Sequence, residues 1–436
     1  MTELLSDWET QALSKVTSLI RDGSHGTHSD VADGVPLLSA KDVRDGTVDI
    51  PADCRRIPLQ DYQSLHRHYE LQKDDILLTI VGTIGRCCLL TGDEPKFTFQ
   101  RSVSVLRPST IAPSYLCHYL RSEPFQTTLK ALTNASAQGG VYLGALATCE
   151  VCYPRFRLEQ AKIAEVLSAV DSAIEQTAAL VAKQLRIRTG LLQDLLTCGI
   201  DQNGIVRSES THRFKHSSMG RIPEGWEVSP AESLCDAVID CKNRTPPVTD
   251  EGYPVIRTPN VRNGEFVFPD LTYTDSHSYE IWTARGKPRT GDVVITREAP
   301  FGEACEIPSD LTDSCLGQRM MMYQPNPKKL RSDYLVYAIY SEAVRAKLLE
   351  LAGGSTVGHI RVGDVRRLPI PHPVCIREQG RIAAVLTASR TAIQELRIQL
   401  DKLSSLKAGL MQDLLTGRVR VTPLLEAGDQ LLKEAS

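Results

Sequence analysis

The sequence lacks the long apolar runs that insertion into a membrane requires. No stretch of its 436 residues approaches ~18 consecutive apolar positions, and residues 1–21 mix acidic and basic side chains where a signal peptide would be apolar. The 12 cysteines follow no regular framework, so we expect reduced thiols and no disulfides. These absences predict a cytoplasmic protein that makes no membrane contact.

A basic excess is missing as well. The chain has 50 lysines and arginines against 53 aspartates and glutamates, which gives a formal net charge of −3. Proteins that hold nucleic acid only by neutralising phosphates usually carry a clear positive charge. Any binding to nucleic acid is therefore expected to come from local patches or to be shared with a basic partner.

Catalytic signatures are also absent. The sequence has no Gly-x-x-x-x-Gly-Lys-Ser/Thr loop and no Gly-x-Gly-x-x-Gly turn, which disfavours a nucleotide hydrolase or a Rossmann enzyme. It has no Asn-Pro-Pro-Tyr or Asp-Pro-Pro-Tyr segment, which an amino-methyltransferase would be expected to show. Glu94-Pro95-Lys96 resembles a Glu-x-Lys nuclease fragment, but its Gly-Asp-Glu-Pro context favours a turn. We predict no catalytic residues and no cofactor held by this chain.

Metal-ligand patterns are incomplete. Cys149 and Cys152 have the spacing of zinc ligands, yet no second Cys-x-x-Cys and no nearby histidine pair completes a set of four. His25 and His28 lie in a turn-like stretch, where a surface position or a contact to DNA is favoured over a metal. The sequence therefore predicts structural cysteines and no metal site.

What the sequence does contain is a repeat of half the chain. Leu-Leu-Gln-Asp-Leu-Leu-Thr at 191–197 returns as Leu-Met-Gln-Asp-Leu-Leu-Thr at 410–416. Other pairs follow at nearly the same offset: Trp8-Glu9 with Trp226-Glu227, Asp75 with Asp292, Gln100-Arg101 with Gln318-Arg319, and Glu159-Gln160 with Glu378-Gln379. A period of this length is that of a domain and not of a solenoid unit.

Each copy changes character along its length. Short apolar and β-branched runs between Gly, Pro, Asp and Asn predict strands at 35–38, 76–81, 102–106, 293–296 and 320–323, and helical spacing follows around Tyr115 and Tyr334. The last part of each copy keeps apolar residues three and four positions apart, as a coiled-coil seam does. The 39 residues 159–197 would form a helix roughly 58 Å long at ~1.5 Å per residue.

These patterns predict an α+β fold. Two repeated mixed α/β domains are separated by two long helices, which pack on each other as an antiparallel coiled coil with pseudo-two-fold symmetry, because each helix has one narrow apolar stripe. The predicted boundaries are 1–157 for the first domain, 158–197 for its helix, 198–225 for a linker, 226–375 for the second domain, 376–418 for its helix and 419–436 for a C-terminal tail.

The repeated motifs resemble those of the specificity subunit of a type I restriction-modification system. The resemblance is carried by the paired Gln-Asp-Leu-Leu-Thr helix ends, the paired Glu-Gln-x-x-Ile-Ala helix starts at 159–164 and 378–383, the prolines at 369, 371 and 373, and the segment 220–226. It covers nearly the whole chain. Two departures are Arg155-Phe156-Arg157 in place of a proline run before the first helix, and Cys198 before the expected glycine.

The resemblance implies a role and partners. Each of two target-recognition domains would read one half of a split double-stranded DNA site, with the long helices as spacer. The subunit would have no catalytic activity of its own. It would position two methyltransferase subunits, which use S-adenosylmethionine, and the restriction subunits that assemble on them, which use ATP and Mg.

Candidate DNA-contacting residues are the polar side chains of the sheet-domain loops, since Arg and Lys suit guanine or phosphate and Asn and Gln suit adenine. They are His25, Thr27, His28, Lys41, Arg44, Arg86, Gln100, Arg101, Lys242, Asn243, Arg244, Arg257, Asn260, Arg262, Gln318 and Arg319. For each one alone, a solvated surface role is the competing interpretation. Candidate subunit-assembly residues are those of the repeated helix ends: Gln193, Asp194, Leu195, Leu196, Gln412, Asp413, Leu414 and Leu415.

Two other functions stay open at the level of sequence. One is an adaptor whose coiled coil joins two protein-binding domains without reading DNA. The other is a metal-dependent nuclease that uses Glu94 and Lys96.

Overall fold

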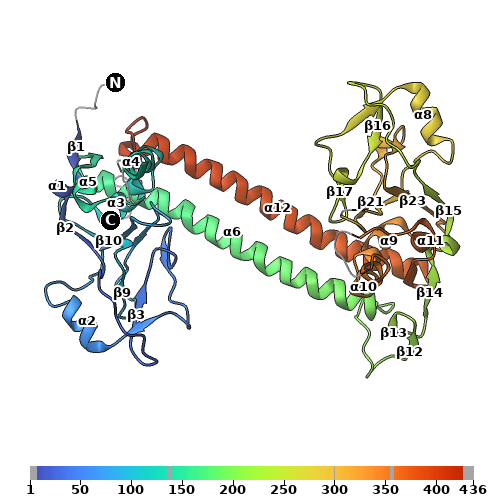
Figure 1. The fold of residues 1–436 in the computed structure, drawn as a ribbon, viewed down its shortest axis with the longest axis horizontal. Coiled ribbons are helices and arrows are strands. Elements are labelled where there is room, and N and C mark those ends of the chain that lie inside the picture. The colour runs from blue at the N-terminus through green and yellow to red at the C-terminus, as the bar shows by residue number, and fades with distance from the viewer. Residues whose placement is uncertain (1–6, 135–138, 299, 354–357, 426–436) are drawn as a thin grey trace, which may run out of the picture. The chain divides into compact units, whose positions relative to one another are not determined.

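The computed structural model describes residues 7–134, 139–298, 300–353 and 358–425 (Figure 1). The chain divides into two compact units. Unit 1 consists of Met1–Ala178 with Ile398–Ser436, and unit 2 of Ala179–Arg397. Each unit therefore holds one sheet domain and a part of both long helices. Among the described residues, no helix combines the length and apolar character needed to span a membrane.

The centre of unit 1 is a four-stranded antiparallel sheet of order β2-β10-β7-β8. Its middle strands are almost wholly buried, which explains their continuous apolar sequence. Its strands are β2 (Thr17–Asp22), β7 (Ile76–Thr79), β8 (Cys87–Leu89) and β10 (Val103–Pro108). A three-stranded sheet has the order β6 (Arg56–Ile57), β3 (Val35–Leu38) and β9 (Thr98–Phe99). Two ribbons are β1 (Trp8–Ala12) with β11 (Glu150–Pro154), and β4 (Val43–Arg44) with β5 (Thr47–Val48).

Short helices complete unit 1. They are α1 (Leu13–Val16), α2 (Leu59–Leu65), α3 (Pro113–Leu120), α4 (Glu123–Asn134) and α5 (Leu143–Thr148). Helix α3 begins with proline, which fits the first turn because its missing N–H would have no partner there. Its buried face packs into the same core as Trp8.

Unit 2 repeats this plan. Its main sheet has the order β15 (Cys235–Asp240), β23 (Met320–Pro325), β20 (Val293–Thr296) and β21 (Ala304–Glu306). The second sheet is β19 (Thr272–Thr274), β16 (Tyr253–Ile256) and β22 (Cys315–Leu316), and the ribbons are β14 (Trp226–Pro230) with β24 (Pro369–Pro373) and β17 (Val261–Arg262) with β18 (Glu265–Phe266). The helices are α7 (Ala231–Leu234), α8 (Ser276–Thr283), α9 (Ser332–Ile339), α10 (Glu342–Leu351) and α11 (Val362–Arg366), with 3-10 turns η1 (Thr258–Asn260) and η2 (Ser309–Leu311).

The repeated aspartates are scaffold residues of the main sheets. Asp75 accepts hydrogen bonds from Arg107 at 2.7 and 2.8 Å, whereas Asp292 accepts one from the neutral amide of Gln324 at 2.8 Å. Burial raises the pKa of Asp292, because removal from water penalises the charged carboxylate. The same position thus keeps its carboxylate while its partner varies.

Strand pairing corrects one match made from the sequence. Val103 pairs with Thr79 in unit 1, and Met320 pairs with Thr296 in unit 2. The equivalent of Arg319 is therefore Ser102, and Arg101 corresponds to Gln318. The sequence match of Gln100-Arg101 with Gln318-Arg319 was wrong by one residue, because identical letters outweighed the strand register.

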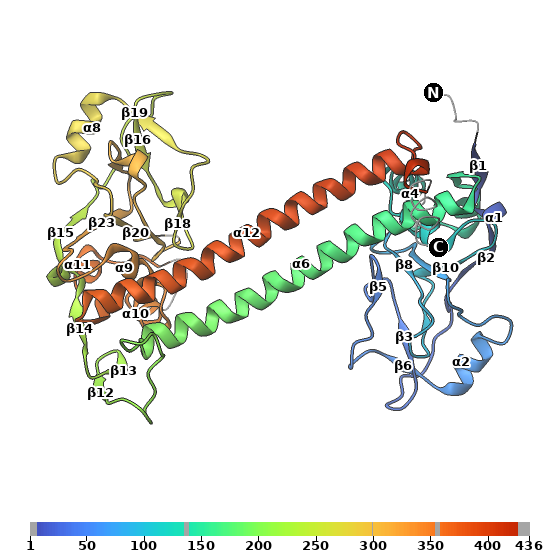
Figure 2. The same ribbon diagram turned by 180° about the vertical axis from the view of Figure 1, so that it is seen from behind.

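The two long helices are α6 (Arg157–Thr197) and α12 (Ile376–Leu414), and they lie side by side (Figure 2). In unit 1, Lys407 of α12 lies 2.6 Å from Asp171 of α6. In unit 2, Arg381 near the start of α12 donates to the carbonyl of Gln202, just beyond the end of α6, at 2.8 Å. The start of each helix thus meets the end of the other, and the predicted antiparallel fold is confirmed.

The segment predicted as linker and the described part of the predicted tail, residues 419–425, pack against the cores. Residues 198–225 form the hairpin β12 (Phe214–Ser217) and β13 (Gly220–Pro223), and they bury Ile200 and Ile222 in the core around Trp226. Beyond α12, Val421 is buried in the core around Trp8. The reason for both corrections is the same: isolated apolar residues in a polar segment anchor it to a core.

Candidate nucleic-acid interface

In unit 1 three loops meet beside the end of strand β7. The Ile80 amide donates to the Ser102 carbonyl at 2.9 Å, and the Val141 amide donates to the Ile80 carbonyl at 2.9 Å. The Arg101 amide donates to the Ser24 carbonyl at 3.0 Å. These backbone bonds bring together segments that are more than 100 residues apart in the sequence.

A cavity of about 600 Å³ opens where these loops meet. Its lining is Asp22, His25, Ile80, Val81, Arg101, Gly140, Val141, Tyr142 and Leu143. The predicted residues His25 and Arg101 thus share one site. Tyr142 was not predicted, although the residue is 58% exposed beside them. A lone exposed tyrosine has no sequence signal until the fold brings it beside the other loops.

Unit 2 builds the same junction from other side chains. The Arg297 amide donates to the Arg319 carbonyl at 2.9 Å, and the Ile360 amide donates to the Arg297 carbonyl at 3.0 Å, as in unit 1. Glu298 occupies the position of Val81. Its two carboxylate oxygens lie 2.6 Å from Nε of Arg319 and 2.7 Å from Nδ1 of His359.

Sequence reasoning found Arg319 but missed Glu298 and His359. Glu298 is one acid among many in the sequence, and His359 lies 61 positions away from it. Only the matched backbone bonds identify these residues as parts of one site. We call Glu298, Arg319 and His359 the triad of unit 2.

The other predicted residues of unit 1 are spread over its surface. Thr27 and Lys41 are exposed, and Arg44 is paired with Asp49 at 2.6 Å. Arg86 donates to the Val43 carbonyl at 3.4 Å, and Gln100 is half-buried in a bridge to Ser24.

His28 has a structural role that the sequence did not suggest. Its Nδ1 lies 2.8 Å from Asp61, and its Nε2 lies 2.6 Å from the Ser24 hydroxyl. Both ring nitrogens are therefore occupied within the chain, and the side chain is largely buried. The prediction of a DNA contact at His28 is corrected to that of a loop brace.

In unit 2 three predicted residues form hydrogen bonds that brace one loop. Asn260 is fully buried; it accepts a hydrogen bond from the Arg257 amide at 3.0 Å and donates to the Val267 carbonyl at 3.1 Å. Arg257 donates to the Asp270 carbonyl at 2.7 Å, and Arg262 donates to the carbonyl of Val261 at 2.7 Å. A buried, satisfied amide cannot reach a base edge, so Asn260 is a wrong prediction.

The remaining predicted residues of unit 2 are accessible. Lys242 and Arg244 lie over the Trp282 ring, at 5.3 and 5.1 Å from its centroid, a cation–π arrangement. Asn243 is exposed, and Gln318 is half-buried next to the triad. These stay predictions for DNA contact.

The repeated helix ends serve the chain's own cores. Leu195 and Leu196 are buried with Trp226 in unit 2, and Leu414 and Leu415 are buried with Trp8 in unit 1. These four leucines are therefore not a free surface for a partner, which corrects the assembly prediction for them. Of the other four predicted assembly residues, Gln193, Asp194 and Gln412 are exposed and Asp413 is half-buried.

The repeated glutamates at the starts of the two long helices are buried and bound by arginines. Glu378 accepts hydrogen bonds from Arg207 at 2.5 and 2.9 Å and from Nε1 of Trp226 at 3.0 Å. Glu159 is held by Arg420 at 2.6 and 2.7 Å. The sequence marked the two glutamates as a motif but gave no sign of these arginine partners.

The glutamines that follow them tie each helix start to its sheet domain. Gln160 donates to the Pro154 carbonyl at 2.7 Å and accepts from the Ala112 amide at 2.7 Å. Gln379 repeats both bonds with Pro373 and Arg331, at 2.8 and 2.9 Å. The Glu-Gln motif is thus a junction between helix and domain.

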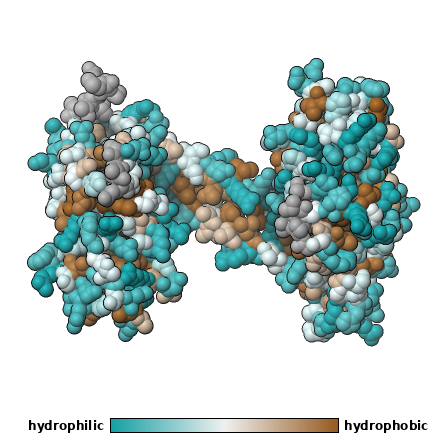
Figure 3. All heavy atoms as spheres, viewed as in Figure 1, coloured by the Kyte–Doolittle hydropathy of each residue, from teal (hydrophilic) through white to brown (hydrophobic). Residues whose placement is uncertain are grey.

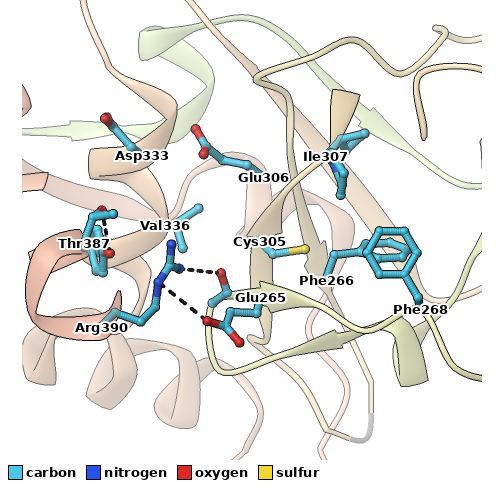
Figure 4. Close-up of a pocket in the computed structure, with 13 residues that line it drawn as sticks. Glu265, Phe266, Phe268, Cys305, Glu306, Ile307, Asp333, Val336, Thr387 and Arg390 are labelled. Carbon is cyan, nitrogen blue, oxygen red and sulfur yellow. Dashed lines mark hydrogen bonds and ion pairs between the residues drawn. The ribbon is translucent and has the colours of Figure 1, made fainter. Parts of the chain in front are cut away.

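A second cavity, of about 350 Å³, lies in unit 2 between β18, β21, α9 and α12 (Figure 4). Arg390 points toward Glu265, 3.6 Å away, and donates to the Gly264 carbonyl at 3.2 Å. Asp333 is paired with Arg331 at 2.6 Å. None of the predicted DNA-contacting residues lines this cavity, so it is separate from the triad.

The residues of the alternative functions take part in local structure. The Glu94 carboxylate accepts hydrogen bonds from the amides of Thr91 and Gly92, at 2.6 and 2.8 Å, as a turn cap does. The Cys149 thiol donates to the Ala145 carbonyl. Within the described part of the chain, no group of three or more His, Cys, Asp or Glu is arranged to hold a metal ion.

Two copies of one α+β domain, with unlike loop residues on a common scaffold and paired antiparallel helices, define a protein built on an internal repeat. The family is given by comparison with known proteins. The profile of the family described as "Type I restriction modification DNA specificity domain" matches residues 7–183 and again residues 223–401, so the chain belongs to this family.

Curated relatives are named as specificity subunits of type I restriction enzymes. Over 438 residues the chain is 25% identical to the "Putative type I restriction enzyme MjaX specificity subunit" of Methanocaldococcus jannaschii, covering 96% of this chain and 95% of that protein. It is 29% identical over 178 residues to the "Type I restriction enzyme EcoBI specificity subunit" of Escherichia coli, covering 39% and 37% of the two chains. The family is one of specificity domains, and the chain is accordingly a specificity protein and not itself an enzyme.

Solved structures share the fold. The S subunit of a type I restriction-modification system from M. genitalium matches with a TM-score of 0.58 at 12% identity, covering 95% of this chain and 97% of that one. A chain from a structural study of type I R-M complex assembly and conformational transition matches with a TM-score of 0.53 at 18% identity, covering 96% and 100%.

Proposed function

We propose that this chain is the sequence-reading subunit of a type I restriction-modification complex, and that each unit reads one half of a two-part double-stranded DNA site. One observation carries the proposal: the two units share sheet order and loop junctions, yet the junctions present different side chains. A common scaffold with unlike loop residues suits two different half-sites, because base edges are distinguished by donor and acceptor patterns.

The partners proposed are two methyltransferase subunits, with S-adenosylmethionine bound to them, and restriction subunits that use ATP and Mg. The long helices support such docking, since they expose large apolar side chains, among them Leu180, Ile187, Ile398 and Leu406. In Figure 3 apolar residues (brown) gather over the paired helices. Exposed apolar patches of this kind mark protein interaction sites. We expect the complex to act in the cytoplasm.

The net charge of −3 agrees with a complex in which this chain reads bases and its partners contact phosphates. A chain without basic excess gains little from non-specific phosphate contacts, so its own side chains are available for base reading. The partners would then supply much of the phosphate neutralisation.

The experiment is a methylome of cells that express this chain together with its cognate methyltransferase. We expect N6-methyladenine at one motif of two separated halves. Exchanging residues 231–368 for the matching segment of a relative with another motif should change one half only, while β14 and β24 keep the junction of Trp226 with α12 intact. Unchanged methylation on co-expression would contradict the proposal and favour an adaptor. DNA cleavage by the purified chain with Mg alone would favour the nuclease.

A further inference from the structure

The backbone conformation of Arg319 is the first sign that it has a special task. Its φ is +73°, in the left-handed region. The other non-glycine residues with positive φ in the described part of the chain are Asp74, Asn263 and Asp270, whose short polar side chains tolerate that conformation. An arginine gains nothing from it, and such local strain is concentrated at functional sites.

The side chain of Arg319 is held through one nitrogen, and its other donors remain available. Glu298 engages its Nε at 2.6 Å, and His359 in turn lies 2.7 Å from the other oxygen of Glu298. Among the described residues, the two terminal nitrogens of the guanidinium have no hydrogen-bond partner, and the side chain is 51% exposed. A guanidinium fixed through Nε presents two parallel donors, the arrangement that matches O6 and N7 of guanine.

A second arginine stands behind the triad. Arg297 is buried, and its Nε has no hydrogen-bond partner among the described residues. Its main chain bonds to both Arg319 and Ile360, so it belongs to the same junction. Its Nη1 donates to the Ile360 carbonyl at 3.4 Å, so the buried guanidinium is only partly hydrogen-bonded. Such a group favours an electron-rich group at the surface beside it, such as the acceptor edge of guanine or a phosphate.

Unit 1 has none of this chemistry at the equivalent positions. Ile80 and Val81 replace Arg297 and Glu298, and Ser102 replaces Arg319. Val81 and Tyr142 are exposed there around the 600 Å³ cavity. The side chains at these equivalent positions therefore differ in kind, since they are charged in unit 2 and uncharged in unit 1.

We propose that the triad of unit 2 reads a guanine, with Arg319 as the base-contacting residue and Glu298 and His359 as positioning residues. Unit 1 lacks this element. The inference deepens the proposed function and rests on it.

Three variants of the assembled complex test the proposal: Arg319→Ala, Arg319→Gly and Glu298→Gln. A matched control is Arg221→Ala, since the Arg221 side chain is 48% exposed against 51% for Arg319, and it too is paired with a carboxylate, that of Glu209. Exposed pairs of this kind contribute little to stability. Glycine also removes the conformational strain at position 319, so Arg319→Gly is expected to melt no lower than the unaltered protein.

The readout is the methylated motif of co-expressing cells, with the half read by unit 2 assigned by the exchange of residues 231–368. Both variants of Arg319 should relax the specificity for guanine at one position of that half. The loss in discrimination against the other bases should be about tenfold to a hundredfold. Glu298→Gln should relax the same position less. The other half and the Arg221→Ala motif should not change.

The failures of the inference and of the proposed function are distinct. If the unaltered chain confers no two-part motif, the proposed function is wrong. If it confers such a motif but Arg319→Ala leaves every position unchanged, or if the half read by unit 2 contains no guanine, the inference is wrong and the proposed function stands. A drop in melting temperature for Arg319→Gly would also overturn the inference, because it would show a structural role.

Discussion

Replacing Glu378 by alanine should destabilise unit 2 more than replacing Glu159, its counterpart, destabilises unit 1. Both carboxylates are buried at the start of a long helix and are bound by an arginine through two short hydrogen bonds. Glu378 also accepts the Nε1–H of Trp226 at 3.0 Å. In unit 1 the Nε1 of Trp8 has no partner among the described residues, so no such bond is lost there.

The magnitude follows from these contacts. Removing one partner of a buried ion pair costs about 3–5 kcal/mol, and this loss is common to both variants. Glu378→Ala additionally leaves the Trp226 donor unsatisfied, at about 1–3 kcal/mol. After Glu159→Ala, Arg420 still has Asp7 at 3.5 Å, which lessens the loss in unit 1. The two units are of similar length, so the extra destabilisation should appear as roughly 2–12 °C in melting temperature.

Hydrogen exchange resolved by segment, combined with thermal melting, measures each unit separately. Glu378→Gln is the control, because it keeps an acceptor oxygen for Trp226 while removing the charge, and its effect should lie between those of the wild type and Glu378→Ala. Equal losses for Glu378→Ala and Glu159→Ala, or a larger loss for Glu159→Ala, would refute the assigned role of Trp226.

Three further variants probe the junctions and the core. Leu414→Ala should lower the free energy of unfolding in urea by about 2–5 kcal/mol, because Leu414 is buried in a core. The control Gln412→Ala, at an exposed position, should lower it by about 0.5 kcal/mol or less. Similar effects of the two variants would mean that Leu414 is not a core residue. Burial lowers the pKa of His118 to about 4. Below pH ~6.5 the folded state therefore binds fewer protons than the unfolded state, so the free energy of unfolding should fall by about 3 kcal/mol between that pH and pH 4. Urea titrations at several pH values should show a smaller fall for His118→Gln. An unaltered dependence of the unfolding free energy on pH would exclude His118 as its source. Gly199 and Gly204 both have positive φ, but an added Cβ at Gly199 would lie 2.5 Å from Glu378 Oε1 and at Gly204 would meet nothing within 4 Å. Gly199→Ala should therefore lower the melting temperature more than Gly204→Ala, and the reverse order would contradict the junction geometry.

The repeat, the main strands and the antiparallel helices were predictable because their signals are local. Buried middle strands such as β7 give short continuous apolar runs, and the seam of α12 buries Ile382, Leu386 and Ile393 at spacings of four and seven residues. These patterns need no knowledge of what lies opposite. Because the two halves of the chain repeat each other, the fold predicted for the first domain could be extended to the second.

The loop residues were less predictable because their roles depend on neighbours far away in the sequence. Asn260 and Arg319 look alike as polar loop residues, yet one is fully buried and the other is exposed in a strained conformation. Residue type indicates that a side chain can bind a base but not whether the fold has already used its hydrogen bonds. Glu298 and His359 were invisible for the same reason, since their pairing exists only after the loops meet.

The near-identity of the repeated helix motifs has a cause within the chain. Leu195 and Leu196 complete the core that contains Trp226, while Glu378 from the other helix holds that tryptophan and Arg207. Unit 1 repeats the core with Leu414 and Leu415 and the ion pair with Glu159 and Arg420, but not the bond to its tryptophan. Each core therefore needs the end of one long helix and the start of the other, so a change in either motif would loosen a domain. The loops that meet beside β7 and β20 do not complete a core together with a long helix. The two units can therefore differ there in charge and still share one fold.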